Sequence, residues 1–311
     1  MLSRVANTIY WLGRYMERTN GMLQVILTQY ISSQDDISNF TWGPLLKMYG
    51  ELSDEEINKI EGSSSEALKY MLLNPSNSAS TLNNIIYSRE NARGIQDHIS
   101  KEVWQCLNDF YHFIRDGNKI KEDTLADPVS TIDQLIRNGL LFTGTVDNTM
   151  VRGEGFTFIN IGKFLERAIH TSDITRIKMN ELYNDKNDTF DSMKLRYLLN
   201  SLFGFEVYLK TYKGTFTKKN VLDLVLYNPN FPHSILYSVE RLYKYFCRLR
   251  PESLPENYEH MEFLIGKTMN NVKYTLANEN DSKSLNAFLS QTRLELFDIS
   301  NAFNKYYFGN T

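Results

Sequence analysis

The residues best suited to holding a ligand lie between positions 88 and 108. Arg89 and Arg93 stand four residues apart, so in a helix they occupy the same face. The apolar pattern predicts one helix from about Leu82 through Phe110, with both arginines on its inward side. Arginine keeps its charge at physiological pH, so a buried pair requires carboxylates or a bound anion as partners. The predicted inward positions are Leu82, Ile86, Arg89, Arg93, Gln96, Ser100, Val103, Leu107 and Phe110.

Two interpretations of this arginine pair stay open. In the first, carboxylates of the chain neutralise the pair; the available groups are Glu17, Glu90, Asp97 and Glu166. In the second, the pair lines a recessed pocket for a carboxylate or phosphate ligand. The candidate pocket residues are Arg89, Glu90, Arg93, Gln96, Trp104 and Asn108.

A second group of charged residues belongs to a short motif that the chain contains twice. The stretch YWLGRYMER, residues 10–18, is followed about 150 residues later by NIGKFLER, residues 160–167. Both copies contain glycine, a basic residue, an aromatic residue and then a Glu-Arg pair in the same order. The charged residues of the two copies are Arg14, Glu17, Arg18, Lys163, Glu166 and Arg167.

These charged residues have three possible roles. Glu17 follows Arg14 at a spacing of three, so the two side chains can pair directly on one helix. Such a pair can be a solvated surface strip, a functional site or an ion pair between two helices. The helix that carries it is unusually apolar, which favours the interhelical ion pair.

Signals of catalysis and metal binding are weak in this sequence. The phosphate-binding and nucleophile motifs GxGxxG, GxxxxGK[ST] and GxSxG are absent, and the two cysteines do not form a CxxC pair. Glu166 and His170 share a helix face, but a di-metal helical bundle needs several carboxylates and two Glu-x-x-His pairs. We therefore expect no metal and no cofactor, and we favour a non-catalytic role while enzymatic activity stays open.

Helical periodicity runs through the whole chain and predicts an all-α helical bundle. A second repeated element supports an internal duplication, because Tyr87, Ser88 and Glu90 match Tyr-Ser-x-Glu at an offset of 150. At the same offset, the second copy has apolar residues where the first copy has Arg89, Arg93 and Gln96. These residues are Val239, Tyr243 and Phe246. We predict a first repeat over residues 1–148 and a second over 149–311, packed together as one compact unit.

Composition excludes some classes of protein. The net charge of −3 argues against a general nucleic-acid surface, which requires a dense cationic patch. No apolar run has the length of a membrane span, and the N-terminus carries no signal-peptide cleavage pattern. We therefore expect a soluble cytoplasmic protein that binds neither nucleic acid nor membrane; its oligomeric state stays open.

Four blocks of the sequence, in order, resemble the bacterial alpha-E domain family, an all-helical domain named for its Glu-Arg motifs. The blocks are MLSRVANTIYWLGRYMERTNGML (1–23), WGPLLKMYG (42–50), SRENARGIQDHISKEVWQCLN (88–108) and MVRGEGFTFINIGKFLERAIHTS (150–172). Lys163 departs from the pattern, because the first copy has Arg14 at the matching position. Lysine keeps the charge but loses the bidentate fork of arginine, so the two copies are not expected to be equivalent.

The resemblance implies partners rather than a reaction. Family members are typically encoded beside, or fused to, an ATP-grasp-type ligase and a transglutaminase-like peptidase. This implies an accessory or scaffold protein of a bacterial peptide-modification system. The alternative is an enzyme or ligand-binding domain built around the arginine pocket, and a helical docking surface for an unrelated partner is a third possibility.

Overall fold

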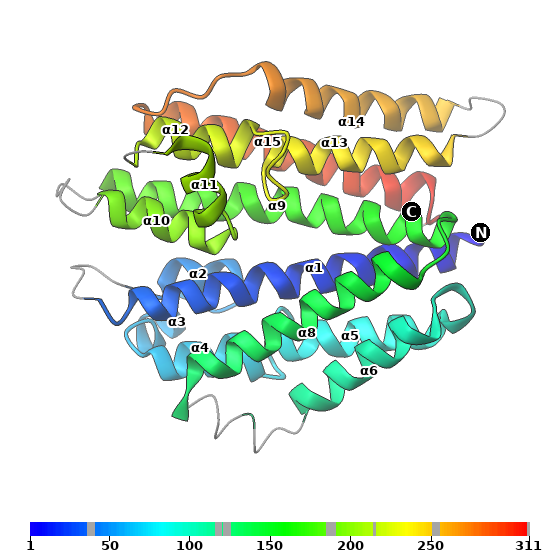
Figure 1. The fold of residues 1–311 in the computed structure, drawn as a ribbon, viewed down its shortest axis with the longest axis horizontal. Helices are drawn as coiled ribbons and strands as arrows, with labels where there is room; N and C mark the ends of the chain where they lie inside the picture. The colour runs from blue at the N-terminus through cyan, green and yellow to red at the C-terminus, as the bar shows by residue number, and fades with distance from the viewer. Residues whose placement is uncertain are drawn as a thin grey trace. The chain divides into compact units, whose positions relative to one another are not determined.

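The computed structural model describes residues 1–35, 41–115, 120, 126–184, 191–213, 216–250 and 256–309. Within these ranges all regular elements are helical, which confirms the all-α prediction (Figure 1). The chain divides into two compact units, which we call the N-terminal unit (residues 15–150) and the C-terminal unit (residues 1–14 and 151–311). The long helix α1 (Ser3–Ser32) contributes to both. The predicted first repeat (1–148) includes residues 1–14, whereas these residues belong to the C-terminal unit of the structure. The duplication itself remains a prediction.

Four long helices build the C-terminal unit. They are α9 (Glu154–Asn184), α13 (Ile235–Phe246), α14 (Glu256–Tyr274) and α15 (Ser282–Tyr306). α13 and α15 each pack against both α9 and α14, so the four helices close into a bundle, which Figure 1 shows as neighbouring rods. Shorter elements complete this unit: α10 (Asp191–Ser201), α11 (Phe205–Tyr212), α12 (Lys218–Leu222), a π-helical turn (Asp223–Tyr227) and a 3-10 turn (Cys247–Leu249).

Aromatic rings fill the core of this bundle. Phe246 of α13 stacks on Tyr258 of α14 with ring centroids 4.7 Å apart, and it meets Phe303 of α15 edge-on at 6.2 Å. Tyr10 of α1 packs against the same Phe303 at 5.8 Å. Most residues of α9 are buried, so the second copy of the Glu-Arg motif lies in the interior.

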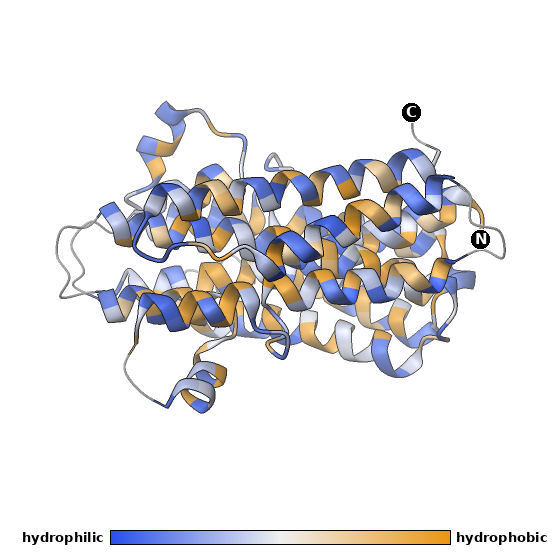
Figure 2. Cartoon of the chain, turned by 90° about the horizontal axis from the view of Figure 1, so that it is seen from above, coloured by the Kyte–Doolittle hydropathy of each residue, from blue (hydrophilic) through white to orange (hydrophobic). Residues whose placement is uncertain are grey.

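The N-terminal unit consists of the rest of α1 and a series of shorter helices. In chain order they are α2 (Gly43–Met48), α3 (Asp54–Ile60), α4 (Ser64–Leu73), α5 (Thr81–Gly94), a 3-10 turn (Gln96–His98), α6 (Lys101–Arg115) and α8 (Pro128–Thr149). α5 packs against α4 and α6, and α6 packs against α8. Figure 2 shows hydrophobic and hydrophilic residues alternating along most helices, as expected for amphipathic elements.

Local sequence explains where several helices begin. Ser53 and Glu56 form a reciprocal capping box at the start of α3, as their spacing predicts. The side chain of Ser63 accepts a hydrogen bond from the backbone N–H of Glu66 at the start of α4. Such caps satisfy backbone N–H groups that have no partner within the helix.

The prediction of one helix from Leu82 through Phe110 is wrong. α5 ends at Gly94, a residue that favours helix ends, and α6 begins at Lys101. Between them the Ser100 hydroxyl accepts a hydrogen bond of 3.2 Å from the Val103 N–H, which fixes a new helix start. The break lets α6 fold back against α5, so the face predicted from a single continuous helix does not exist.

Candidate functional site

The two motif glycines allow α1 and α9 to cross closely within the C-terminal unit. A Cβ atom at Gly13 would collide with the backbone oxygen of Ile159, and a Cβ at Gly162 would collide with the backbone oxygen of Tyr10. Each helix therefore places its motif glycine against the backbone of the other. This reciprocal contact brings Arg14, which follows Gly13, next to α9.

Arg14 forms a buried ion pair across this crossing. Its Nε donates to Oε2 of Glu166 over 2.7 Å, and the two residues are only 4% and 5% exposed. Its Nη1 donates to the Ser300 hydroxyl of α15 over 2.8 Å and to the Tyr10 hydroxyl over 3.3 Å. The guanidinium also lies 4.7 Å from the ring centroid of Trp11. One arginine thus joins α1, α9 and α15.

The electrostatics of this pair keep Arg14 charged. Burial alone would lower the pKa of Arg14, but the interactions with Tyr10 and Glu166 outweigh it, so the pKa of Arg14 lies above its ordinary value. A permanently charged, buried guanidinium with several hydrogen-bond partners acts as a structural tie. Its positive charge is paired with Glu166 inside the fold.

The other motif residues lie beside aromatic rings or in the interior. Arg18 lies 5.8 Å from the Tyr15 ring centroid, and Lys163 lies 5.3 Å from that of Phe164. Glu17 is buried. The motif as a whole thus combines charge with aromatic and buried surroundings.

Two side chains of α9, Arg167 and Thr171, bond to the backbone at Pro232 and His233, a connection that the sequence patterns did not indicate. Arg167 Nη1 donates to the carbonyl of Pro232 over 3.1 Å, and the Thr171 hydroxyl donates to the carbonyl of His233 over 3.0 Å. Burial, reinforced by the electrostatic influence of Arg167, His170 and Lys163, lowers the pKa of His233 well below its ordinary value. His233 is therefore neutral at neutral pH. Its position 66 residues after Arg167 leaves no local signal.

Arg89 is held by groups of its own unit. Its Nε donates to the side-chain oxygen of Asn108 over 2.9 Å, and its Nη1 pairs with Glu90 over 3.0 Å. Its guanidinium lies 4.3 Å from the ring centroid of Tyr111 and 5.6 Å from that of Trp104. With Arg93, which also pairs with Glu90, the structure thus brings together five of the six predicted pocket residues, and it adds Tyr111.

The predicted inward face is wrong for Arg93 and Gln96. The side chain of Arg93 is 66% exposed and lies 3.6 Å from Glu90, and Gln96 is exposed in the 3-10 turn. The buried face of α5 instead carries Ile85, Ser88 and Ala92, each about one position earlier in the chain than the predicted inward residue. Sequence reasoning missed this face because, apart from Ile85, its buried residues are small or polar.

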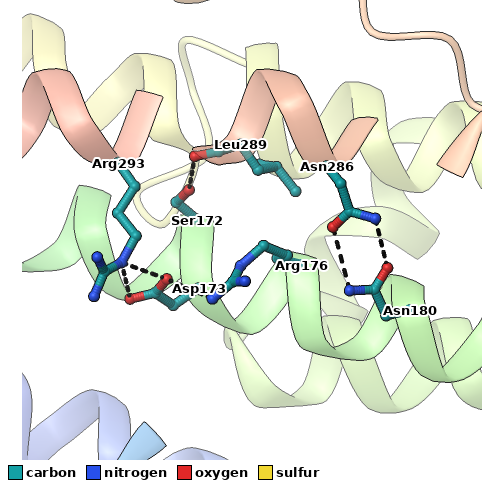
Figure 3. Close-up of polar contacts among 7 residues, drawn as sticks. All are labelled: Ser172, Asp173, Arg176, Asn180, Asn286, Leu289 and Arg293. Carbon is teal, nitrogen blue, oxygen red and sulfur yellow. Dashed lines mark hydrogen bonds and ion pairs between the residues drawn. The ribbon is translucent and has the colours of Figure 1, made fainter. Parts of the chain in front are cut away.

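A polar seam between α9 and α15 also lacked any sequence signal. The Nε of Arg293 donates to both carboxylate oxygens of buried Asp173, over 2.8 and 3.0 Å, and Arg176 lies 3.6 Å from the same carboxylate (Figure 3). Asn180 and Asn286 exchange hydrogen bonds of 3.2 and 2.7 Å. The Arg293–Asp173 and Asn286–Asn180 contacts join residues more than 100 positions apart, so no local pattern could have shown them.

The described residues contain no group of three or more histidine, cysteine or acidic side chains arranged to hold a metal ion. Glu166 and His170 share a helix face, but Glu166 binds Arg14. Among the same residues, no helix combines the length and the apolar character needed to cross a membrane.

Curated proteins similar to this chain come from mycobacteria. Uncharacterized proteins of Mycobacterium bovis and of two Mycobacterium tuberculosis strains are each 22% identical to it over 258 residues. The match covers 77% of this chain but only 29% of each relative, so the chain spans less than a third of their length. No solved structure matches the chain. A family model described as a predicted alpha-helical domain with a conserved ER motif matches residues 1–308, and the chain therefore belongs to the Alpha-E family.

Proposed function

We propose that this chain is a non-catalytic accessory subunit of a bacterial, cytoplasmic peptide-modification system. The observation that carries the proposal is the buried ion pair of Arg14 with Glu166, at 2.7 Å. The family is described by a conserved ER motif, and in this chain Glu166, the first residue of one Glu-Arg pair, binds Arg14 of another helix. A motif used for packing suits a protein that supports the chemistry of a partner.

The length of the relatives supports a role beside other protein regions. Most of each mycobacterial relative lies outside the part that this chain matches. A helical domain that forms part of longer proteins is well suited to position neighbouring regions. By family resemblance, the partners we propose are an ATP-grasp-type amide ligase and a transglutaminase-like peptidase.

We also infer that the two halves of the chain arose by duplication. Tyr15 packs against Tyr87 with ring centroids 5.4 Å apart, and the matching residues Phe164 and Tyr237 pack at 6.1 Å. The two matching serines behave alike, because each donates its hydroxyl to the carbonyl four residues earlier. These bonds are Ser88 to Asn84 and Ser238 to Ser234, at 2.7 and 2.8 Å. Equivalent contacts inside each unit favour a common origin.

Co-purification with an ATP-grasp-type ligase, the partner proposed above, tests the accessory role. We expect a stable complex in which this chain changes the rate of the ligase without itself consuming ATP. The variant Glu55→Lys, changed at an exposed position of α3, serves as the folded control protein in this experiment. Failure of the two proteins to associate at low salt, with both shown to be folded, would count decisively against the proposal.

A second candidate function is an anion site at Arg89. It is favoured by one observation: Glu90 is shared between two guanidinium groups, at 3.0 Å from Arg89 and 3.6 Å from Arg93, which leaves one positive charge in excess. Together with Trp104, this charge could select a carboxylate or phosphate ligand. A thermal-shift screen with phosphate, nucleotides and acidic peptides should show stabilisation in the wild type that Arg89→Leu removes without unfolding the protein.

A further inference from the structure

The N-terminal unit contains a groove of about 550 Å³ between α3 and α4 that neither candidate function uses. This volume lies within the range of about 300–1,000 Å³ that is usual for sites of small ligands. α3 and α4 supply most of the lining, and Leu52, Asn74 and Pro75 complete it. The groove is therefore built by one face of each helix and by the segments that follow Gly50 and Leu73.

Apolar side chains form the less exposed part of the groove. Leu73 is buried, and Leu52, Ile60 and Tyr70 are half-buried. Tyr70 can lie close to the chain because Gly50 has no side chain: a Cβ there would come within 2.6 Å of the tyrosine oxygen. This part of the groove suits a large apolar group.

The exposed part of the groove carries charges of both signs. α3 contributes Glu56 and Lys59, and α4 contributes Glu66 and Lys69, so these four charges sum to zero. Lys69 Nζ pairs with Glu66 over 2.9 Å, but both side chains are about half exposed, and such surface pairs are weak. A ligand that carries one charge of each sign can replace these contacts, whereas a ligand of one sign meets repulsion as well as attraction.

We propose that this groove binds a short peptide that has a large apolar side chain and both of its charged ends. The apolar side chain lies against Ile60, Tyr70 and Leu73. The ammonium end pairs with the glutamates, and the carboxylate end pairs with Lys59 and Lys69. The proposal rests on the proposed function, because a peptide-modification system requires a site that presents the peptide to the ligase.

Calorimetric titration of the full chain with the dipeptide phenylalanyl-leucine tests this site. We expect saturable binding, and the same dipeptide with acetylated and amidated ends should bind at least about fivefold more weakly, because its end charges are gone. The double variant Lys59→Glu, Lys69→Glu should weaken binding of the uncapped dipeptide by a similar factor. Lys47→Glu is the matched control, since Lys47 is 72% exposed on the same unit and lies outside the groove.

Three results would overturn the proposal: no binding of the dipeptide at millimolar concentration, equal binding of capped and uncapped forms, or equal loss in the Lys47→Glu control. Thermal melting of each variant shows that it is folded. Association with the ligase is measured separately on the same proteins. A chain that joins the ligase but binds no peptide refutes the groove alone, and a chain that binds peptide but no ligase refutes the accessory role alone.

Discussion

The Nε of Arg14 lies 2.7 Å from a carboxylate oxygen of Glu166, and both side chains are almost completely buried. The pair connects residues 152 positions apart in the sequence. Burial of two charges is costly, and mutual pairing with further hydrogen bonds is what makes it tolerable. The pair therefore fixes one arrangement of α1 and α9 within the C-terminal unit, because any other arrangement would leave a charge buried alone.

Replacing Glu166 with glutamine should destabilise the protein strongly. Glu166→Gln leaves the Arg14 guanidinium buried without its carboxylate, which typically costs about 3–5 kcal/mol. Urea unfolding measures the loss. Asp133→Asn is the control, because it breaks an equally short pair with Arg137, 2.7 Å long, on an exposed surface, and should cost at most about 1 kcal/mol. Equal losses of unfolding free energy in the two variants would show that burial does not increase the contribution of the Arg14–Glu166 pair to stability.

Adding a methyl group at a motif glycine should destabilise the crossing of α1 and α9. Gly162→Ala places a Cβ against the backbone of Tyr10, which cannot move aside as a flexible side chain can, and overpacking of this kind costs about 1–3 kcal/mol. Gly144→Ala in α8 is the matched control, since nothing lies within 4 Å of its added Cβ. That change should stabilise the helix by up to about 1 kcal/mol. In urea unfolding we expect Gly162→Ala to lower the free energy of unfolding and Gly144→Ala to raise it.

Stability should decrease on acidification because of His233. The pKa of His233 is lowered in the folded protein, first by burial and then by Arg167, His170 and Lys163. The unfolded chain therefore binds this proton more readily, starting near its ordinary pKa of about 6.5. The contribution of neutral His233 to the free energy of unfolding is complete above that pH. It decreases as the pH falls below it, by up to about 1.4 kcal/mol per pH unit.

The variant His233→Asn isolates this effect. Urea unfolding between pH 5 and 8 should give a shallower dependence on pH than in the wild type. His98→Asn, at an exposed position, should leave the dependence unchanged. A wild-type slope in His233→Asn would mean that other groups cause the acid sensitivity.

The Asp173 carboxylate should contribute more to stability than an exposed one. Asp173→Asn weakens the charge-assisted hydrogen bonds from Arg293 and the attraction to Arg176, and we expect a loss of about 1–3 kcal/mol. A double-mutant cycle with Arg293→Ala separates the coupling from the effect of each single change. Asp54→Asn, whose partner Lys47 is also exposed, should change stability by less than about 1 kcal/mol. A coupling near zero would make the seam in Figure 3 energetically unimportant.

Local patterns in the sequence predicted much of the secondary structure. The spacing of Ser53 and Glu56 indicates the start of α3, and the spacing of Ser63 and Glu66 indicates that of α4. Capping and apolar periodicity act over a few residues, so they can be read directly from neighbouring positions. The same reasoning failed between Gly94 and Ser100, where the apolar pattern continues across a break that only a glycine and a serine cap indicate.

The sequence by itself determined that this chain is helical and that its Glu-Arg motif occurs twice, and it favoured an interhelical ion pair for Arg14. Only the tertiary structure decided which partner it has. Spacing allows Arg14 to pair with Glu17 three residues away, but it gives no sign of the Glu166 partner, 152 positions along the chain. The same holds for Arg293 and Asp173, and for the outward direction of Arg93. Spacing along a helix fixes which side chains share a face, but the face that is buried depends on which distant helix packs against it.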